Sequence, residues 1–394
     1  MTYDNVREIL RGRDLPCALL DLELLEQNAR DVLRRAASLP VRLGTKSLRC
    51  VEVLRRVTAL SDRFSGFLAY SAREAAWLAS LGLDDIIVAY PTVGSGDLEA
   101  VSGEVARGKS IVLMVDDAAQ LGPIASAGAS RRVVLPVCID LDMSSQFPGL
   151  YFGVRRSPVR SPEDALRLAD DIGGNPWLRL DGLMGYEAQI SGMQDALPRR
   201  AAKNALVRKL KERSILEINA RRAQTVEALR AAGFALRFVN GGGTGSVEST
   251  VADSSVTEVT VGSALYGPTL YDGFAAFAPA PAMTFALSIA RNPRRGIYTC
   301  SGGGYIASGP PGPDRAPAPY LPAGGSLLPH EGAGEVQTPV RFRKIPPLSL
   351  GDPIVFRHAK SGEICERFNT VLFVRDGAIV DEIETYRGAG QSFL

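Results

Sequence analysis

The chain has 394 residues, of which 45% are apolar and 22% charged, and its formal net charge is +2 at pH 7. This balance is typical of a soluble globular protein, and a net charge so close to zero argues against a nucleic-acid or other polyanionic partner. The length fits one large domain with a smaller one, or two domains of similar size.

Cysteine usage and the first residues point to a cytoplasmic protein. The five cysteines are widely spread and no pair has CxxC spacing, so neither a disulfide framework nor a zinc ribbon is indicated. The first sixteen residues are charged and lack an apolar signal-peptide core. No segment reaches the roughly 20 apolar residues that a membrane helix needs, so we expect no membrane partner.

The first two thirds of the chain alternate short apolar runs with helical patterns. An apolar run at 17–21 precedes a helical pattern at 24–37. Eight strand candidates follow, at 41–43, 63–68, 85–89, 110–115, 133–140, 181–184, 236–239 and 258–261. Helical patterns lie between them, at 72–80, 117–124, 162–171 and 201–232. Eight strands alternating with helices predict an α/β fold, a (β/α)8 TIM-like barrel.

A doubly wound open sheet is the structural alternative. It would normally carry a glycine-rich loop after its first strand, where this chain has LGTKSLRC at 43–50.

The last third of the chain differs in composition and in its secondary-structure pattern. Residues 302–325 are rich in glycine and proline, and strand patterns occur at 283–289, 340–342 and 354–357. The runs 370–375 and 378–384 flank Asp376-Gly377, a strong hairpin signal. We expect a C-terminal antiparallel β domain, with 17–21 as a further strand. The predicted domains are therefore a barrel at 24–273 and a β domain formed by 1–23 plus 274–394.

Polar residues follow most of the predicted barrel strands. They are Lys46, Tyr70, Tyr90, Asp142, Tyr186 with Glu187, the segment 240–246, and Gly262 with Ser263 and Tyr266. In β/α barrels the working residues lie just past the C-terminal ends of the strands, so these side chains predict an active site at one face.

Two of these features indicate specific chemistry. The turn at 241–246 combines glycines with Thr244 and Ser246, and such a turn binds a phosphate; the alternative is a tight turn without a ligand. Lys46 at a barrel mouth is expected to be desolvated, with a lowered pKa that makes it an amine nucleophile. An exposed loop lysine is the alternative.

Together these motifs resemble the fold-type III pyridoxal 5′-phosphate enzymes, the alanine racemase superfamily. Within it the chain is similar to the D-threonine aldolase and D-serine dehydratase branch, and to proteins described as amino acid deaminase/aldolase. The resemblance covers nearly the whole chain. Its motifs are PCALLD (16–21), RLGTKSLRC (42–50), GLMGY (182–186), GGGTGS (241–246), VGSALYG (261–267), VRDG (374–377) and TYRG (385–388).

The resemblance implies a pyridoxal 5′-phosphate site. Lys46 would hold the cofactor as a Schiff base, with Tyr186 and Tyr266 in the same site. The phosphate would lie on Gly242, Gly243, Thr244, Gly262 and Ser263. Thr260 falls where alanine racemase places an arginine against the pyridine nitrogen, which implies a weaker electron sink.

Three departures from the branch matter. Its arginine to the cofactor's phenolic oxygen is missing, so either Tyr151 or Arg155 serves instead or this bond is absent. Its histidine near the sixth strand is also missing, and Glu187 is the nearest titratable substitute.

The third departure concerns the divalent metal that the branch binds in its β domain. Lys360 stands where the second ligand after His358 is expected. His358 with Cys365 or Glu363 could form a metal site; alternatively no metal binds and Lys360 supplies a positive charge instead.

The resemblance implies a homodimeric lyase that cleaves or forms the Cα–Cβ bond of a β-hydroxy-α-amino acid of D configuration. Glu187, or a metal-bound group near His358, would remove the β-hydroxyl proton. Three alternatives are a dehydratase that eliminates water from a D-serine-like substrate, an amino acid racemase, and a non-catalytic carrier of the cofactor. Known carriers consist of the barrel alone, so the C-terminal domain argues against the last.

Overall fold

The computed structural model describes residues 2–394 and divides them into two compact units. Unit 1 comprises residues 2–31, 47–56 and 263–392, and unit 2 comprises 32–46, 57–262, 393 and 394. Residues 24–31, 47–56 and 263–273, which the sequence assigns to the barrel, thus belong to unit 1.

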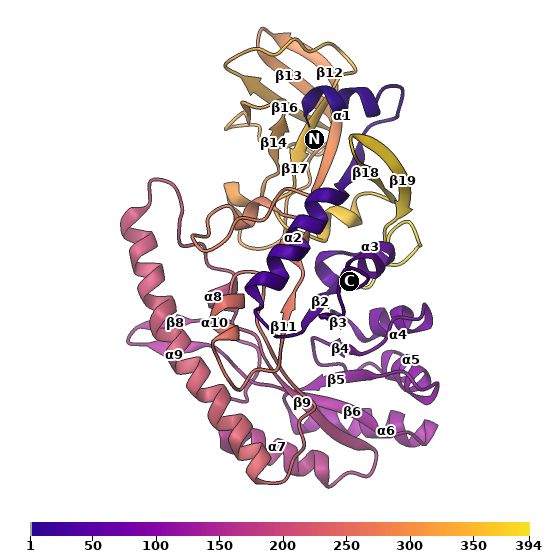
Figure 1. The fold of residues 1–394 in the computed structure, drawn as a ribbon, viewed down its shortest axis with the longest axis vertical. Helices are drawn as coiled ribbons and strands as arrows, with labels where there is room; N and C mark the ends of the chain where they lie inside the picture. Colours follow the sequence, from indigo (N-terminus) through magenta and orange to yellow (C-terminus); the bar gives the residue numbers. More distant parts are fainter. Residues whose placement is uncertain (1) are drawn as a thin grey trace. The chain divides into compact units, whose positions relative to one another are not determined.

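Unit 2 is a closed barrel of eight parallel strands, which confirms the fold predicted from the sequence. The barrel order is β10-β11-β2-β3-β4-β5-β6-β9 (Figure 1). The strands are β2 (Val41–Gly44), β3 (Phe64–Ala69), β4 (Ile86–Val88), β5 (Ile111–Val115), β6 (Leu135–Asp140), β9 (Leu178–Gly185), β10 (Phe238–Gly241) and β11 (Glu258–Val261). Each overlaps one of the eight apolar runs in the sequence.

Helices connect these strands, as parallel pairing requires. They are α4 (Ala72–Ser80), α5 (Ser95–Ala106), α6 (Leu121–Arg131), α7 (Pro162–Gly173), α8 (Ala188–Ser191), α9 (Ala201–Ala231) and α10 (Val247–Val251). The start of α7 shows why a helix forms there: Ser161 and Asp164 form a capping box, and Pro162 occupies the first turn.

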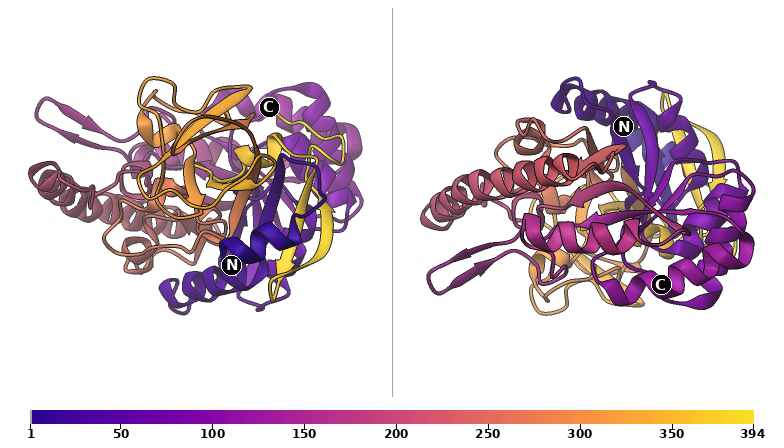
Figure 2. Two further views of the ribbon diagram at one scale, coloured as in Figure 1. Left: turned by 90° about the horizontal axis from the view of Figure 1, so that it is seen from above. Right: turned by 90° about the horizontal axis from the view of Figure 1, so that it is seen from below.

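A short hairpin of unit 2 was not expected from the sequence. It pairs β7 (Ser145–Phe147) with β8 (Leu150–Phe152), and strands of three residues are too short to show a periodicity. In both views of Figure 2 this hairpin and one end of α9 project from the barrel on the same side.

The barrel interior is apolar in its middle and charged at one end. A cluster of buried side chains from β4, β5, β6, β9 and β10 fills the middle, and it consists of Ile87, Val112, Met114, Cys138, Met184 and Phe238. Toward the N-terminal end of β2, the guanidinium of Arg42 is 1% exposed. It contacts Glu258 (Nε–Oε1 2.8 Å) and Asp85 (Nη2–Oδ2 2.9 Å).

The sheet of unit 1 confirms the predicted β domain. Its main path is β15-β16-β13-β12-β1-β18-β19, and β17 joins it through β12. The strands are β1 (Cys17–Asp21), β12 (Met283–Arg294), β13 (Ile297–Ser301), β14 (Ala318–Leu321), β15 (Gly325–Leu327), β16 (Gln337–Phe342), β17 (Pro353–Arg357), β18 (Thr370–Arg375) and β19 (Ala378–Glu384). The expected hairpin at Asp376-Gly377 joins β18 to β19.

Strand β1 lies in the middle of this sheet. It pairs antiparallel with β12 and parallel with β18, so the sheet is antiparallel except at that one pairing. Helix α1 (Tyr3–Ile9) precedes β1, while α2 (Leu22–Arg35) and α3 (Val51–Thr58) contain residues of both units.

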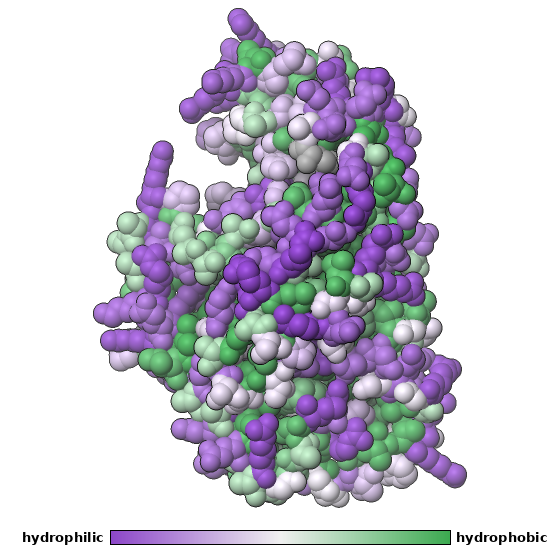
Figure 3. All heavy atoms as spheres, in the orientation of Figure 1, coloured by the Kyte–Doolittle hydropathy of each residue, from purple (hydrophilic) through white to green (hydrophobic). Residues whose placement is uncertain are grey.

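The surface carries no dominant apolar patch on the face shown in Figure 3, where hydrophobic residues lie scattered among hydrophilic ones. Among residues 2–394, no helix combines the length and the apolar character needed to cross a membrane.

Replacing Arg42 by methionine should lower the free energy of unfolding by about 3–5 kcal/mol, because Glu258 would stay buried without its cation. Urea unfolding followed by circular dichroism measures this. The control is Arg73→Met, which removes an exposed partner of Asp97 and should change stability by less than about 1 kcal/mol. Equal effects for the two variants would contradict the structural role assigned to the buried network.

Candidate active site

Lys46 lies at the C-terminal mouth of the barrel, directly after β2. Its Nζ is 3.3 Å from the hydroxyl of Tyr90, which follows β4, and 5.8 Å from the centre of that ring. The Lys46 side chain is exposed to solvent, whereas the sequence analysis expected it to be desolvated. A bound ligand would have to supply the burial.

Arg156 shares this mouth. Its guanidinium lies 5.6 Å from the ring centre of Tyr90 and 5.9 Å from that of Tyr186, within the range of cation–π attraction. Among residues 2–394 it has no carboxylate within 4.0 Å. Arg156 is therefore a cation available to an anionic ligand.

The two residues expected to replace the missing arginine lie elsewhere. The Arg155 guanidinium stacks on the Tyr151 ring at 4.1 Å, and the Tyr151 hydroxyl donates to Ser144 Oγ at 2.7 Å. The sequence analysis named Arg155 and not its neighbour Arg156, which faces the mouth.

The glycine turn after β10 offers backbone donors. Gly242 has a positive φ of +85°, which glycine adopts without strain. A Cβ added to Gly243 would lie 2.3 Å from Ser191 Oγ and 2.9 Å from Cε2 of Tyr186, so glycine is the residue that fits there. The N–H groups of Gly243 and Gly262 have no acceptor among the described residues. Two such donors form a nest for an anion.

Glu187, predicted as a catalytic base, lies behind this turn. It is 1% exposed, and its carboxylate accepts from the backbone N–H of Gly242 at 2.9 Å and from Thr250 Oγ1 at 3.3 Å. It also pairs with the guanidinium of Arg222, which is 0% exposed and contacts Asp253 at 2.9 Å. These contacts position the turn.

Two further residues hold the turn and its neighbour strand. Arg35 donates from Nη2 to the carbonyl oxygen of Thr244 at 2.7 Å, with its side chain 2% exposed. On β11 the Thr260 hydroxyl donates to Asn240 Oδ1 at 3.1 Å and accepts from Asn240 Nδ2 at 2.9 Å. Thr260 is thus a neutral hydrogen-bonding group inside the barrel.

Two carboxyl groups that the sequence analysis did not single out face the same mouth. Val115 and Ile139 are paired neighbours on β5 and β6, so the residues that follow them, Asp116 and Asp140, lie side by side. They are two positions beyond Met114 and Cys138 of the interior cluster, and side chains two apart on a strand share a face.

The pKa of the Asp140 carboxyl is raised well above its ordinary value. Burial raises its pKa to about 7, the charge of Asp116 adds to this, and Arg156 opposes it; Asp142 contributes a smaller repulsion. The Asp116 carboxyl is hydrogen-bonded by Gln120 (Nε2–Oδ1 2.7 Å), and burial raises its pKa too. A carboxyl with a pKa near 7 can act as a general base at neutral pH.

The remaining predicted cofactor residues belong to unit 1. Ser263 Oγ lies 3.0 Å from Ser47 Oγ. Tyr266 is 0% exposed and its hydroxyl donates to the carbonyl of Leu48 at 2.9 Å, so its surroundings are those of a packing residue.

Two residues of the predicted metal site, Cys365 and Glu363, have other partners. Cys365 donates its thiol hydrogen to the carbonyl of Leu48 at 3.3 Å, and burial raises its pKa. The ammonium of Lys360 instead pairs with Glu363 at 2.8 Å. No cluster of three or more His, Cys, Asp or Glu side chains suited to a metal occurs within residues 2–394.

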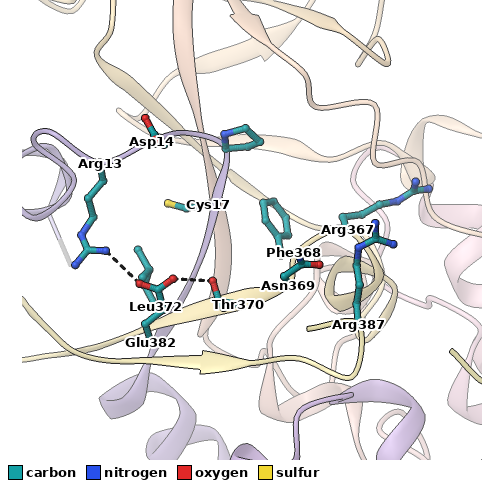
Figure 4. A pocket seen from close by; sticks show the side chains of 11 residues that line it. Arg13, Asp14, Cys17, Arg367, Phe368, Asn369, Thr370, Leu372, Glu382 and Arg387 are labelled. Atoms are coloured by element: carbon teal, nitrogen blue, oxygen red, sulfur yellow. Dashed lines mark hydrogen bonds and ion pairs between the residues drawn. The ribbon is translucent and has the colours of Figure 1, made fainter. Parts of the chain in front are cut away.

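Unit 1 also contains a cavity of about 460 Å³, which is shown in Figure 4. At one side Arg13 and Thr370 both bind the carboxylate of Glu382, at 3.3 and 2.8 Å. Burial raises the pKa of Cys17 to about 12, so the cavity holds no thiolate nucleophile at neutral pH.

The mouth of unit 2 fits pyridoxal 5′-phosphate. Lys46 provides the amine, Gly243 and Gly262 provide backbone donors for the phosphate, and Tyr186 borders the space that a Cβ on Gly243 would fill.

Comparisons with known proteins agree with this arrangement. Residues 20–269 match the family model of the alanine racemase N-terminal domain. The chain is 25% identical over 233 residues to a 3-hydroxy-D-aspartate aldolase of Paracoccus denitrificans (strain Pd 1222), an alignment that covers 59% of this chain and 54% of that protein. It is 28% identical over 276 residues to a D-threonine aldolase of an Arthrobacter species, with 67% and 65% covered. The chain thus aligns with about half to two thirds of the length of these curated relatives.

A similar solved structure is the crystal structure of D-threonine aldolase from Filomicrobium marinum. It superposes with a TM-score of 0.80 at 21% identity and covers 96% of each chain. At this identity the likeness supports the fold.

Replacing Gly243 by alanine should weaken the binding of pyridoxal 5′-phosphate about tenfold or more, because the new methyl group would collide with Tyr186. Titration of the apoprotein, followed by the visible absorbance of the bound cofactor, gives the dissociation constant. Gly122→Ala is the control, since nothing lies within 4 Å of its added Cβ. Unchanged affinity in Gly243→Ala would remove this turn from the cofactor site.

Proposed function

Because the chain belongs to the alanine racemase N-terminal domain family, we propose that it is a pyridoxal 5′-phosphate-dependent lyase. It cleaves or forms the Cα–Cβ bond of a D-β-hydroxy-α-amino acid. One observation carries the proposal: the Lys46 amine and the unpaired N–H groups of Gly243 and Gly262 open on the mouth of one barrel. The two aldolases among the relatives support the reaction class.

The cofactor, when bound, supplies an electron sink next to the substrate's α-carbon. The amine of Lys46 would hold the aldehyde carbon of the cofactor. The backbone of the glycine turn binds its phosphate, and the Glu187–Arg222 pair behind the turn keeps those donors in place. Arg156 binds an anionic oxygen at the mouth, either the cofactor's phenolate or the substrate's carboxylate.

Bond cleavage also needs a base for the substrate's β-hydroxyl proton. Glu187 is buried and its carboxylate oxygens already accept from Arg222, Gly242 and Thr250. Asp140 faces the mouth and carries a carboxyl that ionises near neutral pH. We therefore assign the proton to Asp140, and give Glu187 a positioning role.

Purified protein supplied with the cofactor should release an aldehyde from D-β-hydroxy-α-amino acids and not from their L enantiomers. A panel of both series, assayed for aldehyde and for keto acid with and without added divalent metals, measures this. Lys46→Ala should lose both the visible absorbance of the bound cofactor and the activity, because the variant lacks the amine that would hold the cofactor.

Either of two results would count against the proposal. Keto acid as the main product would make the protein a dehydratase, and the absence of both products would leave a racemase or a carrier.

The rate should depend on pH through Asp140. With a pKa near 7 its carboxyl is protonated below pH 7 and becomes the active carboxylate above it, so kcat/KM should rise through this range. Asp140→Asn should abolish that limb and lower kcat/KM by about 10²–10⁴. Asp116→Asn removes a neighbouring negative charge, so the Asp140 pKa should fall and the limb should move to lower pH. An unchanged profile in Asp140→Asn would exclude it as the base.

A further inference from the structure

Unit 1 contains a cavity that has no role in the description above. Its volume is about 300 Å³, and it is lined by two segments, 305–307 and 358–367. The polar lining residues are Tyr305, His358, Lys360, Glu363, Glu366 and Arg367.

His358 needs a polar partner in this cavity. The side chain is 2% exposed, and neither ring nitrogen makes a hydrogen bond of normal geometry within residues 2–394. A neutral imidazole ring has one donor and one acceptor. Buried polar groups are rarely left unpaired, so these two nitrogens can pair with a ligand in the cavity.

When the ion pairs of the cavity lining are counted among the described residues, one cationic side chain has no carboxylate partner. Lys360 Nζ is 2.8 Å from Glu363 Oε1 and 2.5 Å from Ser308 Oγ, which leaves one N–H of the ammonium unused. Glu366 is paired with Arg49 at 2.5 Å. Both acidic residues of the lining are therefore neutralised.

Arg367 is the remaining charge. Its guanidinium lies 6.0 Å from the ring centre of Tyr305, and it has no ion pair among the described residues. The cavity thus presents a net positive charge and several N–H donors, which repel a divalent cation and attract an anion.

We propose that this cavity binds the carboxylate and adjacent hydroxyl of a β-hydroxy acid, with Lys360 and Arg367 in the place of a divalent metal. Arg367 and the unused N–H of Lys360 donate to the carboxylate, and the neutral His358 ring pairs with the hydroxyl. The choice of ligand class rests on the function proposed above, while the geometry and charge of the cavity do not.

The first test concerns the metal. Full-length protein is incubated with Zn²⁺ or Mn²⁺, desalted, and analysed for bound metal by mass spectrometry; the wild type should hold far less than one ion per chain. Lys360→Cys removes the ammonium, frees Glu363 and adds a thiol two residues after His358. This variant should gain about one zinc ion per chain. Lys209→Cys, at an exposed position of α9, controls for the thiol alone and should gain none.

Two results would overturn the metal replacement. One is a stoichiometric metal in the wild type that a chelator removes. The other is a Lys360→Cys variant that holds no more zinc than the Lys209→Cys control.

The second test concerns the ligand. Malate carries the hydroxyl and carboxylate but no amine, so it cannot react with the cofactor. Calorimetry on the holoenzyme should give an affinity for malate about tenfold lower in Lys360→Gln and in Arg367→Gln. Arg387→Gln should bind like the wild type, since Arg387 lines the cavity of Figure 4 and not this one.

Equal malate affinity in all four proteins would overturn the ligand assignment. The visible spectrum of the cofactor should be the same in each of these variants. A failure of the proposed function would instead appear in the Lys46→Ala spectrum and the product assay, so the two failures are distinguishable.

Discussion

The candidate site depends on one buried ion pair, that of Arg222 with Glu187. Arg222 comes from α9 and Glu187 follows β9, and both are almost completely removed from water. Removing one partner of such a buried pair leaves an uncompensated charge and strongly destabilises the fold. Each charge therefore holds the other in position. Because the same carboxylate accepts from the N–H of Gly242, the pair also fixes the start of the glycine turn. The direction in which Gly243 presents its backbone therefore follows from a contact on the far side of the turn.

The fold was largely predictable from the sequence, for a physical reason. Parallel strands buried on both faces are rich in apolar residues, and β4 and β5 are uninterrupted apolar runs. The β7–β8 hairpin was not predicted because strands of three residues are too short to show a hydrophobic periodicity. The hairpin at Asp376-Gly377 was visible because the turn itself dictates those two residues.

The site was predictable in part. Strand ends locate Lys46 and the glycine turn, because position along a strand decides which residues reach the mouth. The sequence does not show which way a side chain turns after the strand has ended. Arg155 was therefore named where Arg156 faces the mouth, and Glu187 was assigned to the mouth although it lies behind the turn. Asp140 was missed because its unusual acidity comes from burial and from Asp116, on a different strand.

The place of β1 in the sheet of unit 1 has a consequence for how the chain folds as it is synthesised. This strand precedes the barrel in the chain, yet its two neighbours, β12 and β18, follow the whole barrel. Its apolar residues, Leu19 and Leu20, are fully buried in the finished sheet. During translation these residues have no native partner until β12 is made, and the barrel strands can pair before them. The nascent chain must therefore keep this hydrophobic strand from aggregating until β12 and β18 emerge.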